Sequence, residues 1–178
     1  MTMKRWRFST VLLMVGFACM VLFFVSGTAM AASNSCGIVG TWFGAGDSGT
    51  TWFSTYTKGS SSTVGQMNLE WILLDPTLGG FFPDAVRTTN GVGVWEKVNN
   101  HNYKYTWVAY AFDANGAIVY TTRVSGTESV VDCDHVDITY VLELWLPDQD
   151  MNTDPPFFCA TGTALQTRMA LTQATCQQ

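Results

Sequence analysis

The sequence predicts an all-β fold, most simply an eight-stranded antiparallel up-and-down β-barrel, in a single domain spanning residues 32–178. Three observations support this class. Short runs of β-branched and aromatic residues recur along the chain, and Gly, Asn and Asp interrupt them. No window keeps the apolar spacing of an amphipathic helix. Several runs alternate apolar with polar residues, as antiparallel strands with one buried face do. A two-sheet β-sandwich is the alternative architecture.

The expected strands cover residues 38–44, 50–57, 63–74, 91–98, 102–112, 117–131, 134–146 and 158–171. Residues with turn chemistry separate them. Asp113-Ala114-Asn115-Gly116, for example, contains residues that tolerate the positive φ of a tight hairpin. Short connections favour pairing between neighbours in the chain, and closure into a barrel removes exposed sheet edges.

One connection is longer than the others and covers residues 75–90. It is rich in Gly and Pro and carries the adjacent pair Phe81 and Phe82. Two interpretations stay open for this pair. The rings form a lid over a barrel mouth, or they plug one end of the core.

Alternation within the strands gives the barrel an aromatic inward face. The candidate ligand-binding residues on this face are Tyr103, Tyr105, Trp107, Tyr120 and Tyr140. These side chains combine apolar faces with polar tips, which suits a small, mostly apolar ligand with a few hydrogen-bonding groups. An eight-stranded barrel is just wide enough to hold one small ligand or to be filled by its own side chains. A solid aromatic core is therefore the alternative.

The first 31 residues have the features of an export signal. Lys4, Arg5 and Arg7 precede an uncharged apolar run over residues 11–25, and the small residues Ala29 and Ala31 match a signal-peptidase site. The apolar run is shorter than the roughly 20 residues that a membrane-spanning helix needs, which disfavours an uncleaved anchor. We therefore expect a secreted or periplasmic protein with no stable membrane span after cleavage.

The charge of the mature chain limits its partners. Removal of three of the nine basic residues leaves six against fourteen acidic residues, a net charge of −8. So negative a surface repels phosphate backbones and anionic membrane faces, so neither nucleic acid nor a membrane surface is an expected partner. The oligomeric state is left open.

The start of the first strand, Gly40-Thr41-Trp42, together with Arg168 in the last strand, resembles the structural signature of the calycins. This superfamily includes the lipocalins, avidins and fatty-acid-binding proteins. The resemblance implies that Trp42 packs at one barrel end and that Arg168 lies across its indole as a cation–π contact. In those families both residues are structural. The avidin pattern that holds biotin has no counterpart in this chain, so the resemblance implies a scaffold and no particular ligand.

Four cysteines follow the signal, an even number, which suggests disulfide bonds in an exported protein. An even strand count brings both termini to one end of a barrel, so we expect a bridge between Cys36 and Cys176. Cys133 lies at that same end and Cys159 at the opposite one. For this pair, either the loop after residue 146 folds back, or the two thiols are unpaired, or the strand assignment is wrong.

We predict no catalytic residue, metal site or cofactor. His135 and Asp137 share one strand face, but this pair is more typical of a solvated surface than of a metal or acid–base site. The calcium-like start at Asp113 lacks ligands at its fifth and twelfth positions, which are Ala117 and Val124.

The leading hypothesis for function is thus an exported protein that binds a small apolar or aromatic molecule inside a barrel. Two alternatives stay open. One is a barrel enzyme of the cyclase or isomerase type, in which a shaped cavity holds a reactive conformer. The other is a solid barrel that acts only through its surface, as an envelope or adhesion component.

Overall fold

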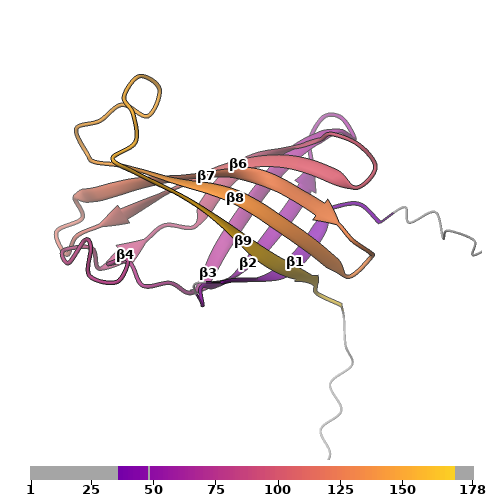
Figure 1. Ribbon diagram of the computed structural model, residues 1–178, viewed down its shortest axis with the longest axis horizontal. Coiled ribbons are helices and arrows are strands. Elements are labelled where there is room, and N and C mark those ends of the chain that lie inside the picture. The colour runs from indigo at the N-terminus through magenta and orange to yellow at the C-terminus, as the bar shows by residue number, and fades with distance from the viewer. Residues whose placement is uncertain (1–35, 48, 171–178) are drawn as a thin grey trace, which may run out of the picture. The chain divides into compact units, whose positions relative to one another are not determined.

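A computed structural model describes residues 36–47 and 49–170 of the chain (Figure 1). The expected export signal and Cys176 lie outside these residues. Within the described ranges, no helix has the length and apolar character needed to span a bilayer.

The described residues form a closed antiparallel barrel of eight long strands, which confirms the predicted fold class. Neighbouring strands pair in the order β6-β5-β3-β2-β1-β9-β8-β7, and β7 returns to pair with β6. The strands are β1 (Gly40–Gly46), β2 (Thr51–Lys58), β3 (Val64–Leu73), β5 (Gly91–Lys97), β6 (Asn102–Phe112), β7 (Ile118–Val130), β8 (His135–Trp145) and β9 (Phe158–Arg168).

A short extra strand, β4 (Arg87–Thr88), pairs with the end of β6 beyond the reach of β5. The sequence did not indicate it, because two residues are too few for alternation to be visible.

The predicted hairpin at residues 113–116 joins β6 to β7. The Asp113 carboxylate accepts hydrogen bonds from the backbone N–H of Asn115 at 2.9 Å and of Ala117 at 2.8 Å. Gly116 adopts a φ of 86°, a left-handed conformation that glycine reaches without steric cost. These bonds also lower the pKa of the Asp113 carboxyl, with the Ala117 N–H contributing most.

Inside the barrel, five glycines lie directly opposite an aromatic residue on the neighbouring strand. The pairs are Gly44 with Trp52, Gly65 with Trp95, Gly93 with Trp107, Gly126 with Tyr105 and Gly162 with Tyr140. A Cβ on any of these glycines would lie within 3.0 Å of its partner's side chain. Each aromatic side chain therefore covers the backbone of a glycine on the neighbouring strand, an arrangement that stabilises glycines in β-sheets.

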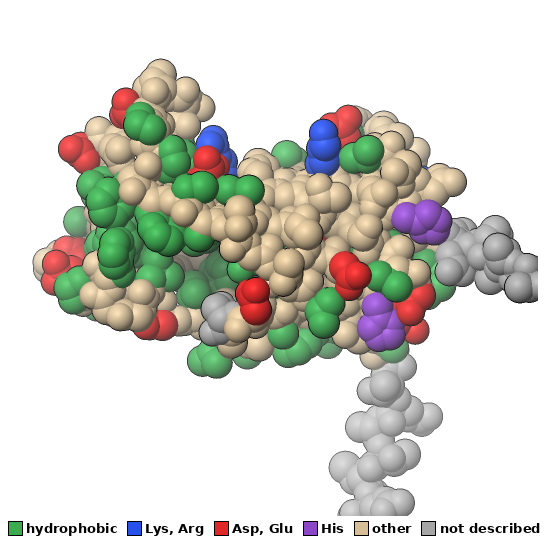
Figure 2. All heavy atoms as spheres, in the orientation of Figure 1, with side chains coloured by type: hydrophobic (Ala, Val, Ile, Leu, Met, Phe, Trp, Pro, Cys, Tyr) green, Lys and Arg blue, Asp and Glu red, His purple; other side chains and the backbone are tan. Residues whose placement is uncertain are grey.

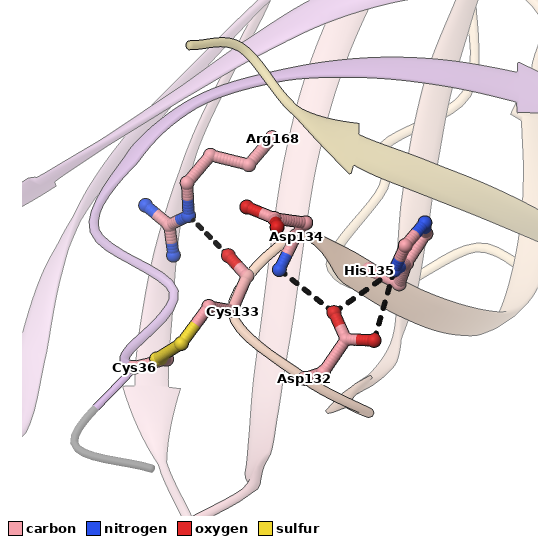
Figure 3. A network of polar contacts seen from close by, with 6 residues as sticks. All are labelled: Cys36, Asp132, Cys133, Asp134, His135 and Arg168. Atoms are coloured by element: carbon pink, nitrogen blue, oxygen red, sulfur yellow. Dashed lines mark hydrogen bonds and ion pairs between the residues drawn. A yellow bond between two sulfur atoms is a disulfide. The ribbon is translucent and has the colours of Figure 1, made fainter.

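One end of the barrel, the closed end, is filled by buried side chains of the larger hydrophobic core. Arg168, the last residue of β9, lies at this end (Figure 3). Its guanidinium lies 4.1 Å from the centre of the Trp42 ring, as the resemblance implies. It also donates to three backbone carbonyls: Gly37 at 2.7 Å, Val39 at 3.0 Å and Cys133 at 2.5 Å.

Steric crowding at this end explains why the first position of the Gly40-Thr41-Trp42 motif is a glycine. A Cβ at Gly40 would lie 2.7 Å from Nη1 of Arg168, and Gly40 has a φ of 138°. The motif thus leaves room for the arginine to reach the carbonyls behind it.

The predicted bridge between Cys36 and Cys176 is wrong, because Cys36 forms a disulfide with Cys133. Both cysteines lie at the closed end, as expected, but the choice of partner depends on the turn between β7 and β8. Arg168 binds the carbonyls of Gly37 and Cys133, and so holds the two cysteine-bearing segments together. Cys159, at the opposite end, is exposed and unbonded, so of the pair Cys133 and Cys159 only this thiol is free.

The opposite end carries a smaller core beneath the long loop. Phe82 is buried there against Tyr120, with ring centres 4.5 Å apart, and packs with Ala85, Ala111 and Leu144. Phe81 beside it stays exposed. Of the two phenylalanines, one therefore plugs the end and the other lies at its surface.

Candidate ligand-binding cavity

A cavity of about 590 Å³ lies inside the barrel, between the closed-end core and the loops of the opposite end. This volume falls within the range of small-molecule sites. Its lining comprises Gly46, Thr50, Trp52, Leu69, Trp71, Leu74, Asp75, Leu78, Gly79, Tyr105, Trp107, Val124, Ile138, Tyr140, Leu142, Phe158, Ala160, Thr161 and Ala164. Figure 2 shows hydrophobic side chains gathered at the left-hand end of the barrel, where the long loops lie in Figure 1.

Three tryptophans form a continuous aromatic wall. Trp71 meets Trp52 and Trp107 edge to face, with ring centres 6.4 Å and 5.5 Å apart. Trp71 donates its indole N–H to the Thr89 carbonyl at 3.2 Å, which fixes the middle ring. Because Trp52 and Trp107 lie over glycines, the rings line the interior and leave its centre open.

The structure brings three of the five predicted ligand-binding residues together. Tyr105, Trp107 and Tyr140 line the cavity. Tyr103 lies in the closed-end core and packs on Trp95 at 5.8 Å. Tyr120 belongs to the core beneath the long loop, and its hydroxyl donates to the Pro76 carbonyl at 2.9 Å.

Beside the lining residues Tyr105 and Ile138 lies a buried polar cluster that the sequence did not indicate. Glu128 on β7 is 1 % exposed, and Tyr56 on β2 donates a hydrogen bond to its Oε1. Gln166 on β9 in turn donates to the Tyr56 hydroxyl at 3.5 Å. The alternation of Tyr120, Thr122 and Val124, continued along the strand, would have placed Glu128 inward.

The Glu128 carboxyl is shut off from solvent, and no cation among the described residues acts on it. Burial raises its pKa to about 8, against an opposing effect of the hydrogen bond from Tyr56. Its second oxygen, Oε2, has no hydrogen-bond partner among the described residues, and neither does Oε1 of Gln166. Buried polar atoms are normally paired, so this cluster retains unused hydrogen-bonding capacity. None of its three residues belongs to the cavity lining itself.

Tyr105 connects this cluster with the cavity. It lines the cavity, and its hydroxyl lies against Gly126, two residues from Glu128. Burial, and then the charge of Glu128, raise the pKa of Tyr105. Tyr105 thus remains a neutral hydrogen-bonding group between the apolar space and the carboxyl.

The two histidines lie away from the cavity. His101 is exposed in the turn between β5 and β6. His135 pairs through Nδ1 with Asp132 at 2.9 Å, and not with Asp137, on the exposed turn shown in Figure 3. No group of three potential metal-ligating side chains occurs within the described part of the chain.

Comparisons of this chain with protein-family models, with curated proteins and with solved structures found no match. The geometry of the cavity therefore carries the functional argument.

Proposed function

We propose that this protein binds a small apolar or aromatic molecule inside its barrel. The observation that carries the proposal is the cavity of about 590 Å³ walled by Trp52, Trp71 and Trp107. Apolar walls with a few polar tips are the usual composition of ligand sites, and the Tyr105 and Tyr140 side chains supply such tips. An interior of this kind disfavours the alternative of a solid barrel that acts only through its surface.

Two further assignments belong to the same proposal. The closed eight-stranded barrel and the contact of Arg168 with Trp42 support a place among the calycins. The disulfide between Cys36 and Cys133 supports folding in an oxidising compartment, and with the signal-like residues 1–31 it favours a secreted or periplasmic protein.

The test is saturable binding of a neutral apolar fluorophore, N-phenyl-1-naphthylamine, to the purified mature protein. We expect enhanced probe fluorescence, with energy transfer from the cavity tryptophans. Ala160 lines the cavity, so Ala160→Trp should abolish binding by filling its space. Ala45 lies on the exposed outer face of β1, so Ala45→Trp is the matched control and should bind normally.

Wild-type protein that shows no saturable signal would overturn the proposal. Equal binding by the two tryptophan variants would do the same, because the probe would then lie outside the barrel. Circular dichroism establishes that each variant is folded.

Glu128 favours a second candidate, a barrel enzyme of the cyclase or isomerase type. A carboxyl with a pKa of about 8 is suited to general acid–base chemistry near neutral pH. Such an enzyme would exchange the α-protons of a phenyl-substituted alkyl ketone such as 4-phenylbutan-2-one with deuterated solvent, and Glu128→Gln would stop this. Exchange no faster than in buffer would count against catalysis.

A further inference from the structure

Among the residues that the structure describes, the barrel interior contains one acidic group and no basic group to balance it. Of the buried residues, Glu128 is the only Asp, Glu, Lys, Arg or His in the described part of the chain. The groups around it are the neutral side chains of Tyr56, Tyr105 and Gln166. A buried carboxylate is costly unless a positive charge or several donors compensate it, and here one oxygen lacks any partner among the described residues.

The aromatic lining favours the same sign of ligand charge. Aromatic faces carry partial negative charge and attract ammonium groups, most strongly at tryptophan and in sites shielded from water. Three tryptophans and two tyrosines contribute to the cavity wall. An anionic ligand would meet these ring faces, with Glu128 buried beyond Tyr105 and no lysine or arginine among the described lining residues.

The loops at the cavity end of the barrel carry an excess of acidic residues. These residues are Asp47, Asp75, Asp84, Asp113, Asp148, Asp150 and Asp154. Of the described basic residues, Arg87 lies at the same end and Arg123 on β7 forms an ion pair with Glu143 at 2.8 Å. The other four, Lys58, Lys97, Lys104 and Arg168, lie toward the closed end. A cleft surrounded by one sign of charge raises the local concentration of ligands of the opposite sign.

Asp75 brings one of these charges to the cavity itself. It belongs to the lining, and its carboxylate accepts hydrogen bonds from Thr77 and from the Gly79 backbone. These bonds lower the pKa of Asp75, the Thr77 side chain contributing most. The carboxylate is therefore ionised at neutral pH.

From these observations we infer that the ligand is an organic cation, a small aromatic or alkyl amine. Its apolar part packs on the tryptophan wall, and its ammonium group lies beside Tyr105, where it stabilises the ionised form of the Glu128 carboxyl. This inference rests on the proposed binding function and names the class of ligand for it.

The test compares three ligands of one length and different charge: 4-phenylbutan-1-amine, 4-phenylbutan-1-ol and 4-phenylbutanoic acid. Each displaces N-phenyl-1-naphthylamine from the mature protein at pH 7. We expect the amine to bind at least about tenfold more tightly than the alcohol, which corresponds to about 1.4 kcal/mol, and the acid to bind most weakly. In Glu128→Gln the amine should fall to the affinity of the alcohol, while the alcohol is unchanged.

Glu70→Gln is the matched control, because Glu70 is exposed on β3, and it should keep the wild-type order of affinities. An acid that binds as well as the amine would overturn the inference, as would an amine preference that survives in Glu128→Gln. If that variant does not fold, the order of the three ligand affinities in the wild-type protein still tests the preference for a cation. Binding of the alcohol without preference for the amine would leave the binding function standing, whereas displacement by none of the three would count against both.

Discussion

The Glu128 carboxyl is buried, and only one of its two oxygens accepts a hydrogen bond among the described residues, so its ionised form is costly. Its folded-state pKa of about 8 lies above the ordinary value of 4.5. The folded protein therefore binds more protons than the unfolded chain between these two values. It follows that the favourable contribution of protonated Glu128 is complete below about pH 4.5 and is lost as the pH rises toward 8.

We expect Glu128→Gln to raise the free energy of unfolding at alkaline pH and to change it little at pH 5. Glutamine keeps the size of the carboxyl but carries no charge to desolvate. Since each pKa unit corresponds to about 1.4 kcal/mol, the gain at pH 8 should reach a few kcal/mol. Urea denaturation of both proteins at pH 5, 7 and 8 measures it. A difference that does not vary with pH would contradict the assigned protonation of Glu128.

The position of Glu128 was within reach of the sequence, but its surroundings were not. Period-two alternation along β7 places it on the same face as Val124. Its partners Tyr56 and Gln166 come from β2 and β9, and their proximity depends on barrel register and closure. No local pattern encodes those long-range relations.

Most strands were predictable because alternation and turn residues are local properties. The observed β6, from Asn102 to Phe112, coincides with its expected range. By contrast, the division of the aromatic residues between wall and core was not predictable. Tyr103 and Tyr105 share a face of β6, yet only Tyr105 reaches the cavity, because Trp95 packs against Tyr103 nearer the closed end.

The pairing of β8 with β9 offers a test of how the wall shapes the cavity. A Cβ at Gly162 would lie 2.4 Å from Cζ and Oη of Tyr140, the far end of a side chain that lines the cavity. We expect Gly162→Ala to displace that ring into the cavity and to weaken binding of N-phenyl-1-naphthylamine severalfold. The free energy of unfolding should change by no more than about 1 kcal/mol, because the ring moves into open space.

Fluorescence titration and urea denaturation measure the two effects. Thr167→Ala, which alters an exposed residue on the same strand, should affect neither. Unchanged probe affinity in Gly162→Ala would show that the ligand space does not include the site of Tyr140.

At the scale of the molecule, the two ends of the barrel differ in how they are held. The closed end is secured by the Cys36–Cys133 disulfide, by Arg168 and by buried side chains such as Trp42, Trp95 and Tyr103. The cavity end is formed by loops. Stability and ligand binding should therefore be separable, because they depend on opposite ends.

Replacing Cys36 and Cys133 together by serine should lower the free energy of unfolding by about 2–5 kcal/mol, as expected for a disulfide that closes a long loop. The cavity should still bind N-phenyl-1-naphthylamine in the folded double variant. Peptide mapping without reduction should link Cys36 to Cys133, and Cys176→Ser should leave that link intact. A link to Cys176, or loss of probe binding by the folded double variant, would contradict this separation.

The glycine–aromatic pairs have an evolutionary consequence. A glycine codon becomes an alanine codon by one base change, and at Gly44 and Gly162 the atoms that the new methyl group would meet belong to the rings of Trp52 and Tyr140. Both rings line the cavity. Such glycine-to-alanine substitutions would narrow the barrel interior in small steps while the backbone hydrogen bonds between strands remain. Gly44 and Gly162 are therefore positions at which a single substitution can adapt the cavity to a new ligand.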